Sequence, residues 1–266
     1  MTAVPQHPGG PPLPPHTLDA FHRGDFWLVQ PKKGGHRAGM DAMMLAAAVP
    51  SGFQGQLADF GAGAGAAGLA VASRCKGAHV LLVELTAEMT AFARATLTHP
   101  SNAGIAPRAS VLVADVALSG KARAAAGLAD GSLDWVIMNP PFNPAHHRPT
   151  PDALKRQAHV MEDGLFEGWI RSAAAVVKPR GGFAIIARPE SLAAILGAMA
   201  GRFGRAEVVP VHPRADAPAI RVVVRAVRAS RATMVLCPPL VLHEEGDRFS
   251  QRADDINNGR SSLFGD

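Results

Sequence analysis

Cysteine is scarce in this chain, and long apolar runs are missing. The two cysteines, Cys75 and Cys237, stand far apart and form no Cys-x-x-Cys pair, which excludes a disulfide framework and a zinc site built from cysteines. No stretch approaches the ~18 apolar residues of a membrane span. The first residues lack the charged and apolar blocks of a signal peptide. Because free thiols suit a reducing compartment, we expect a cytoplasmic protein with no membrane partner.

Charged residues are also few. Asp, Glu, Lys and Arg make up 18% of the 266 residues, and hydrophobic residues make up 47%. This composition excludes a mostly disordered chain and suits one large α/β domain. The 27 Lys and Arg exceed the 22 Asp and Glu, which gives a formal net charge of +5. Such an excess attracts RNA or DNA, but soluble proteins without a polyanionic partner also reach it, so charge alone leaves both interpretations open.

The two ends of the chain differ in composition from its middle. Residues 1–16 are dense in proline, which opposes helix formation and sheet pairing and predicts a flexible arm. Residues 251–266 are polar and rich in Gly, Asn and Ser, which predicts a flexible tail. Residues 17–250 contain neither an internal repeat nor a second apolar core. We therefore expect a single folded domain there.

Strand-like and helix-like patterns alternate through this domain. After a leading strand at 26–30 and a helix at 41–48, we expect strands at 57–60, 79–84, 110–114, 135–138, 183–187, 207–211 and 221–227, and further helices at 68–74, 88–96, 165–177 and 191–199. Continuous apolar strands separated by helices indicate a parallel sheet. Only the loop 212–219 separates the last two strands, which should therefore form an antiparallel hairpin. The predicted fold is α/β and Rossmann-like, a mixed seven-stranded sheet with an antiparallel terminal hairpin and helices on both faces. This arrangement resembles class I methyltransferases.

A glycine-rich turn follows the strand at 57–60. Asp59 closes the strand, and Gly61, Gly63, Gly65 and Gly68 follow before a helix begins. Two ligands compete for this turn. Gly-x-Gly-x-x-Gly, beginning at Gly63, satisfies the dinucleotide pattern of a nicotinamide oxidoreductase. Asp-x-Gly-x-Gly-x-Gly, beginning at Asp59, resembles motif I of methyltransferases, in which the acid holds the ammonium group of S-adenosylmethionine. An acid close to a pyrophosphate is unfavourable, so we favour S-adenosylmethionine.

Acidic residues also end the next two strands. Glu84 stands about 20 residues beyond the turn, where an acid accepts hydrogen bonds from ribose hydroxyls. Asp115 ends the following strand, and in related methyltransferases that position contacts the adenine amino group. Alternatively, Glu84 could be a solvated residue at the end of a strand, and Asp115 could belong to an ordinary loop. The alternative is stronger for Asp115 than for Glu84.

The segment Asn139-Pro140-Pro141-Phe142 follows the strand at 135–138, so it faces the same cleft as Gly61. It resembles motif IV, [DNS]-P-P-[YFW], of amino-nitrogen methyltransferases. An aromatic amine is a poor nucleophile because its lone pair is delocalised into the ring. The Asn139 side-chain oxygen and the Pro140 carbonyl can accept its two N–H bonds, and the prolines hold these acceptors in place.

Phe142 offers a face on which a base can stack, and Pro141 borders the same substrate site. The nitrogen then attacks the sulfonium methyl group in line, with neither a metal nor a strong general base. Taken alone, the segment could be a proline-rich turn. Behind a matching motif I, it predicts a methyltransferase.

Further segments resemble the bacterial tRNA(Val) adenine N6-methyltransferase family. They are residues 30–31, 35–42, 212–221 and 238–245, and the resemblance runs from about residue 21 to 246. It implies transfer to N6 of an adenine beside the tRNA anticodon. It also implies that Arg37, Gly39 and Asp41 border the cofactor pocket. Arg37 could equally pair with a carboxylate, and Asp41 could be the N-cap of the following helix.

Related families leave the substrate open. N2-guanine methyltransferases of ribosomal RNA carry similar NPPF loops, whereas glutamine N5-methyltransferases of release factors carry NPPY. A DNA adenine methyltransferase would usually need a target-recognition domain, for which there is no room. A non-catalytic RNA-binding or cofactor-sensing protein is a further alternative. The oligomeric state is not predicted.

Basic residues outside the motifs are candidates for contact with RNA phosphates. Arg148 follows the NPPF loop with Lys155 and Arg156, and Arg214 belongs to a possible track with Lys32, Lys33, Arg221, Arg228 and Arg231. Solvated loops are about equally good explanations for each residue. Adjacent His146 and His147 point apart and have no acidic cluster beside them, so we expect no metal. Trp27, Trp135 and Trp169 stand in apolar segments and are expected in the core.

Overall fold

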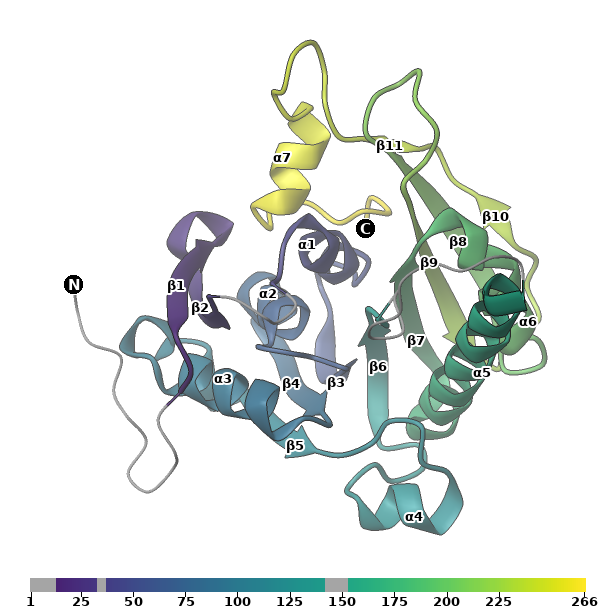
Figure 1. Cartoon of the computed structure of the whole chain (residues 1–266), viewed down its shortest axis with the longest axis horizontal. Coiled ribbons are helices and arrows are strands. Elements are labelled where there is room, and N and C mark those ends of the chain that lie inside the picture. Colours follow the sequence, from purple (N-terminus) through teal and green to yellow (C-terminus); the bar gives the residue numbers. More distant parts are fainter. Residues whose placement is uncertain (1–12, 33–36, 142–152) are drawn as a thin grey trace.

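A computed structural model describes residues 13–32, 37–141 and 153–266, with side chains described from 164 onward in the last range. Its main sheet has nine strands, in the order β10-β8-β9-β7-β6-β3-β4-β5, with β11 also paired to β8 (Figure 1). The strands are β3 (Gln54–Phe60), β4 (Gly77–Glu84), β5 (Ala109–Val113), β6 (Leu133–Met138), β7 (Val177–Ala187), β8 (Phe203–His212), β9 (Arg221–Arg228), β10 (Val235–Leu236) and β11 (Leu240–Val241).

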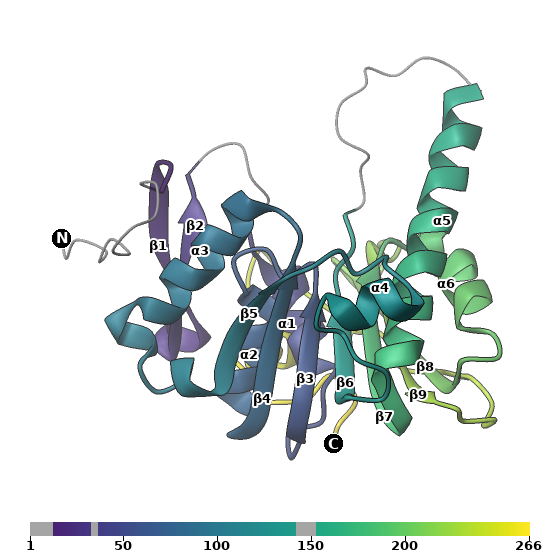
Figure 2. The same ribbon diagram turned by 90° about the horizontal axis from the view of Figure 1, so that it is seen from below.

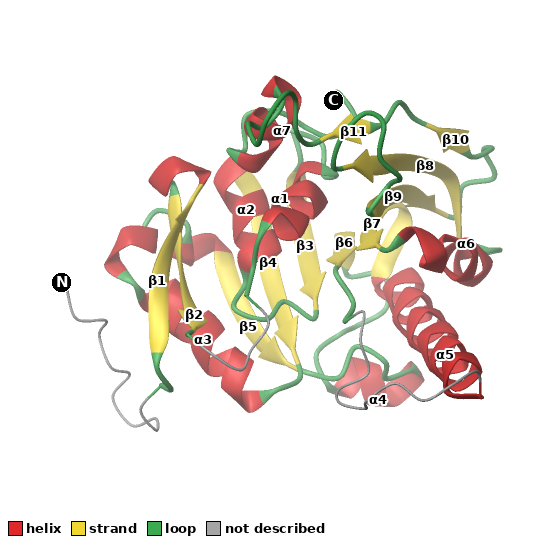
Figure 3. Cartoon of the chain, turned by 45° about the horizontal axis from the view of Figure 1, so that its top comes forward, coloured by secondary structure: helices red, strands yellow, loops and turns green. Residues whose placement is uncertain are grey.

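Two helical layers cover the sheet because successive residues of each central strand point to opposite faces. On one face, Leu57 and Ile137 belong to a core shared with α1 (Met40–Ala47) and α2 (Ala66–Arg74). On the other face, Phe60 and Met138 belong to a core shared with α5 (Ala153–Val176) and α6 (Leu192–Met199). Figure 3 shows the sheet between these helices. Helix α3 (Ala87–Thr98) follows β4, and helix α4 (Gly120–Ala125) follows β5.

The strand directions confirm the predicted fold class. β3, β4, β5, β6 and β7 are parallel to one another, and β9 runs antiparallel to both β7 and β8. The predicted count of seven strands is wrong, because β10 and β11 add two strands parallel to β8. Each of these has only two residues. Strands of two residues are too short to show the alternation of apolar and polar residues from which a strand is predicted.

A separate two-stranded sheet precedes the main one. β1 (His16–Phe21) pairs antiparallel with β2 (Phe26–Pro31), and only β2 was expected. Pro15 accepts a hydrogen bond from the Lys32 amide, and Leu13 packs against a small core around Phe92. The predicted arm therefore ends before Leu13, and residues 1–12 lie outside the described part. Figure 2 shows the hairpin beside α3, at the end of the molecule opposite α5.

The C-terminal segment is folded, which corrects the prediction of a flexible tail at 251–266. It contains α7 (Gln251–Asn257), capped by the Ser250 hydroxyl, which accepts the Ala253 amide. Ala253, Ile256 and Leu263 are buried, and the Leu263 amide donates to the Ala47 carbonyl at the end of α1. Three apolar side chains facing one neighbour outweigh the polar composition around them. Figure 1 shows α7 beside α1.

Among the residues described, no helix has the length and apolar character needed to cross a membrane.

Candidate active site

The carboxyl ends of four adjacent strands bring the predicted site residues to one edge of the sheet. Phe60 of β3 faces both Val83 of β4 and Met138 of β6. The residues just beyond these positions are therefore neighbours along the edge. They are Gly61, Glu84 and Asn139, and Asp115 follows the adjacent strand β5. Open α/β sheets bind their ligands at this edge.

The glycine-rich turn between β3 and α2 has the conformation that its glycines permit. Gly61, Gly63 and Gly65 have φ angles of 70°, 57° and 97°, in the left-handed region. Gly61 also has a close neighbour, because a Cβ placed on it would lie 2.7 Å from the Trp169 ring of α5. Trp169, predicted as a core residue, is half-buried and packs against the core beneath α5 as well as against this turn.

Asp59 is buried beneath the turn, with 2% of its surface exposed. Its Oδ2 accepts a hydrogen bond of 2.8 Å from the Gly68 amide in the first turn of α2. Burial raises the pKa of the Asp59 carboxyl to about 7; the Gly68 hydrogen bond opposes this rise and the nearby Glu84 carboxylate adds to it. A cationic group placed beside Asp59 would favour its charged form.

Gly68 is fixed by close packing. A Cβ there would lie 2.5 Å from the Leu82 side chain and 2.9 Å from that of Val80, both on β4. Close packing against β4 therefore explains why a glycine stands at position 68, the third glycine of the dinucleotide pattern, whichever nucleotide binds.

Glu84 connects the turns that follow β3 and β4. Its Oε2 accepts the Gly63 amide at 2.9 Å, and its Oε1 accepts the Leu85 and Thr86 amides and the Thr86 hydroxyl. Among the described residues, Oε2 accepts only the Gly63 amide and keeps a lone pair for one more donor. Glu84 can therefore hold both turns and still accept a hydroxyl.

Two further groups line the edge next to Glu84. The Leu85 side chain is 60% exposed and places apolar surface beside Glu84. Sequence reasoning missed Leu85, although a leucine immediately after the strand-end acid was a visible signal. Asp115 accepts the Ala117 amide at 2.8 Å through Oδ1 and so organises its own loop.

Asn139 directly follows β6 and carries an unsatisfied acceptor. Its Oδ1 is buried and has no hydrogen-bond partner among the described residues. A buried polar atom without a partner costs free energy unless a ligand satisfies it. Pro140 is buried and Pro141 is exposed. Phe142 and Arg148 lie outside the described residues.

The loop before α1 is held by a network on the β1–β2 hairpin. Arg37 donates to the Asp19 carboxylate at 2.7 Å, and Gln30 bonds both Asp19 and the Ala38 amide. Arg37 thus makes the carboxylate pair that was the alternative to a cofactor contact. The N-cap of α1 is Gly39.

Asp41 therefore lies inside α1, and it pairs with Arg221 at 2.8 Å. Arg214, beyond the carboxyl end of β8, also has protein partners. It donates to the Glu244 and Gly246 carbonyls and pairs with Asp247. Its structural role in this loop was not predicted.

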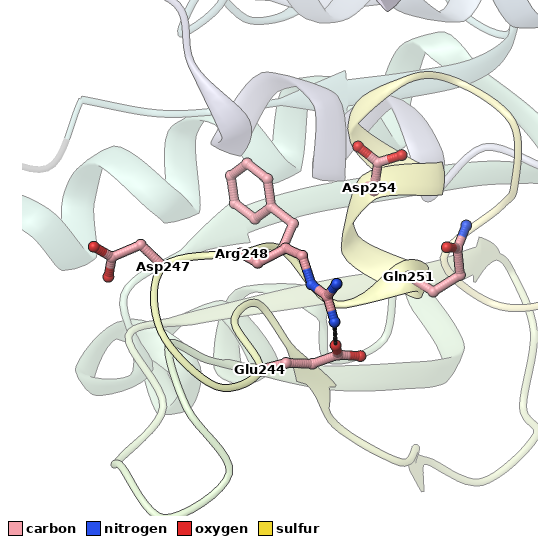
Figure 4. A pocket seen from close by; sticks show the side chains of 6 residues that line it. Glu244, Asp247, Arg248, Gln251 and Asp254 are labelled. Carbon is pink, nitrogen blue, oxygen red and sulfur yellow. Dashed lines mark hydrogen bonds and ion pairs between the residues drawn. The ribbon is translucent and has the colours of Figure 1, made fainter.

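A pocket of about 580 Å³ adjoins the same loop (Figure 4). Its lining is Glu244, Asp247, Arg248, Phe249, Gln251 and Asp254, and it includes none of the predicted site residues. No group of three His, Cys, Asp or Glu that could hold a metal occurs within the described ranges, and His146 and His147 lie outside them.

Comparison with known proteins fits this geometry. The model of the methyltransferase small domain family matches residues 37–214. The chain belongs to this family. It is an S-adenosylmethionine-dependent methyltransferase of the small-domain type, and the dinucleotide interpretation of its glycine turn is set aside.

Solved structures agree with this assignment. A predicted O-methyltransferase from Agrobacterium tumefaciens, protein Atu636, is 43% identical, with a TM-score of 0.74 over 84% of this chain and 98% of that one. Two structures share the fold at a TM-score of 0.50. They are an S-adenosylmethionine-dependent O-methyltransferase from Thermotoga maritima (17% identity, 76% of this chain and 69% of that one) and M. jannaschii TYW2 with AdoMet (12% identity, 80% and 85%). No curated protein matches the chain.

Proposed function

We propose that this methyltransferase acts on an exocyclic amino nitrogen of a nucleobase, most specifically N6 of an adenine in tRNA. The observation that carries the proposal is the buried, unpartnered Oδ1 of Asn139 at the end of β6. An amide oxygen accepts hydrogen bonds but does not remove protons at neutral pH. It therefore suits an amine, whose N–H bonds need orienting rather than ionising.

The acids of the edge would hold S-adenosylmethionine, which supplies an electrophilic methyl group when bound. Asp59 would face the ammonium group, whose charge favours the ionised carboxylate. Glu84 would accept from a ribose hydroxyl through the remaining lone pair of Oε2. Leu85 would pack its exposed side chain against the adenine ring, and Asp115 would accept from the adenine amino group.

The acceptors of the Asn-Pro-Pro-Phe segment would orient the target nitrogen. The Asn139 oxygen and the Pro140 carbonyl would accept its two N–H bonds, which turns the lone pair toward the methyl group. The cofactor would supply the methyl group to the nitrogen that these acceptors hold, and the proton that the amine loses would leave to water. Pro141 and Phe142 would contact the substrate base.

Two features support RNA as the carrier of the base. The net charge is +5, and the segments around residues 30–42, 212–221 and 238–245 resemble the tRNA(Val) adenine N6-methyltransferase family. Arg37 and Arg214 are bound to protein groups, so any contact with RNA requires their second guanidinium edge or an exchange of partners.

The proposal is tested with tritiated S-adenosylmethionine, the purified chain and total RNA from a strain lacking the gene. We expect label in tRNA that digestion recovers as N6-methyladenosine. Label recovered as N2-methylguanosine from ribosomal RNA would keep the chemistry and change the base.

A second candidate is O-methylation, because the 43%-identical Agrobacterium tumefaciens structure is described as a predicted O-methyltransferase. Recovery of 2′-O-methyl nucleosides, or label in small hydroxylated metabolites with none in RNA, would favour it. Label confined to a protein band would instead indicate glutamine N5 as the acceptor.

A further inference from the structure

Among the side chains that the structure describes, a few arginines have a guanidinium group without a protein partner. Among the described side chains, most arginines pair with carboxylates or carbonyl oxygens, such as Arg202 with Glu167. The arginines whose guanidinium groups make no hydrogen bond or ion pair to another described residue are Arg94, Arg171, Arg180, Arg205 and Arg231, and all are exposed. Arg180, Arg205 and Arg231 lie together, and we call them the arginine corner.

Strand register brings Arg180 and Arg205 to the same end of the sheet. Gly182 of β7 faces Val227 of β9, and Val227 faces Gly204 of β8. Arg180 stands two residues before Gly182, and Arg205 follows Gly204. The two arginines therefore stand near the same end of the sheet, on strands that β9 separates.

Arg231 joins them through the segment that follows β9. The Arg205 amide donates to the Ala232 carbonyl at 2.9 Å. A Cβ on Gly204 would collide with the Ser230 carbonyl, so residues 230–232 lie directly against the start of β8.

The backbone at this corner departs from regular strand geometry. Arg180 and Arg205 have φ angles of 69° and 52°, in the left-handed region that non-glycine residues seldom adopt. The register of β8 and β9 also shifts between Gly204 and Glu207. Such bulges re-aim the side chains they carry.

The carboxylates around the corner are already neutralised. Asp134 pairs with Lys178 at 2.6 Å, Glu167 with Arg202 at 2.6 Å, and Glu207 with Arg225 at 2.9 Å. The charge of the three corner arginines is therefore uncompensated.

We propose that the arginine corner binds the phosphate backbone of an RNA substrate, an inference that rests on the proposed function. Guanidinium groups match phosphate geometry, and three of them spread over β7, β8 and the segment after β9 suit an extended polyanion better than one small anion. The corner lies at the edge opposite Asn139, so it supplies affinity without touching the reacting base. The exposed apolar residues Met234, Val235 and Leu236 follow Arg231. An anionic membrane is the competing partner.

The test replaces the three arginines by glutamine in the full chain. The matched control is Lys76→Gln with Arg94→Gln and Lys121→Gln, which removes three exposed charges elsewhere. Fluorescently labelled total tRNA is titrated across a KCl series, and S-adenosylmethionine affinity is measured to confirm folding. Each lost phosphate contact lowers the slope of log K against log salt by ~0.7–0.9. We expect the corner variant to lose about two units of slope and roughly tenfold in affinity, with the control much closer to wild type.

Equal losses in both variants would overturn the inference, because net charge alone would explain them. If the wild type binds tRNA and the corner variant binds it equally well, the inference about the arginine corner is wrong, and the proposed function is unaffected. If the wild type binds no RNA at all, the substrate class fails together with the corner. Loss of binding to phosphatidylserine vesicles with unchanged tRNA binding would assign the corner to a membrane.

Discussion

The two halves of the sheet differ in the charge they carry at the carboxyl edge. Acids follow the strands of the first half, with Asp59 at β3, Glu84 at β4 and Asp115 after β5. Arginines follow the strands of the second half, with Arg188 after β7 and Arg221 at the start of β9. The acids bind backbone amides of their own turns. A cationic methyl donor suits the acids of the first half, whereas Arg221 of the second half is paired with Asp41 and Arg188 lies 4.0 Å from Glu190. Asn139 lies at the boundary between the two halves.

Removing the boundary acceptor should have the largest effect. We expect Asn139→Ala to lower kcat by about 10²–10³, the usual loss when one preorganised hydrogen-bonding group is deleted. The affinity for S-adenosylmethionine should stay within about twofold, because this side chain serves the substrate. Initial rates and calorimetric titration measure both quantities. Asn139→Asp keeps an acceptor and should lose less, whereas an unimpaired Asn139→Ala enzyme would contradict the assignment.

Breaking the acidic half should act on cofactor affinity. Glu84→Ala removes the acceptor of the Gly63, Leu85 and Thr86 amides, and hydrogen bonds to charged groups contribute ~1.5–3 kcal/mol each. We expect the Kd for S-adenosylmethionine to rise about 10- to 100-fold in titration calorimetry. The matched control is Glu88→Ala, an exposed acid in the first turn of α3. A similar loss in both variants would show that the effect is general electrostatics.

The close packing of α2 on β4, beneath the acidic half of the edge, should not tolerate one added methyl group. In Gly68→Ala the new Cβ would meet Leu82 at 2.5 Å and Val80 at 2.9 Å. We expect the free energy of unfolding in urea to fall by about 1–3 kcal/mol. Gly197→Ala in α6, where nothing lies within 4 Å, should instead raise it by up to ~1 kcal/mol. If both substitutions stabilise the protein, then α2 does not approach β4 as closely as described.

The smallest expected effect is a pH dependence. Burial raises the pKa of Asp59 from 3.8 to about 7, so the free protein holds this group protonated below that pH. Its contribution to folding stability is complete below about 4 and is lost as pH rises through about 7.

Cofactor binding should show the opposite trend, because an ammonium group needs the charged carboxylate. We expect the Kd for S-adenosylmethionine to fall several-fold, by about 1 kcal/mol, as pH rises through the Asp59 pKa of about 7. Asp59→Asn should bind more weakly and show a flat profile. The same pH dependence in that variant would assign the titration to another group.

Sequence reasoning reached the parts of the molecule that local rules determine. Continuous apolar runs located the central strands, and the glycine-rich turn was predicted correctly between β3 and α2, because the signals for both lie within a few residues. Asn139, Pro140 and Pro141 were placed correctly after β6 for the same reason.

Features held by distant contacts could not be predicted. Arg225, buried on β9, pairs with Glu207 and with Asp266 of the C-terminal segment, and the Phe264 ring lies against its guanidinium. The composition of residues 251–266 gives no sign of that partner. Arg37 was named from the family resemblance and Arg214 for its charge, whereas their carboxylate and carbonyl partners come from segments elsewhere in the chain.

The most direct test follows the methyl group to its atom. Wild-type protein is incubated with unmodified tRNA and S-adenosylmethionine carrying a deuterated methyl group, and the digested nucleosides are fragmented by mass spectrometry. The account predicts that the label stays on the base fragment of adenosine, as N6-methyladenine. Label on the ribose fragment, or RNA without label beside a methylated hydroxyl compound, would contradict it.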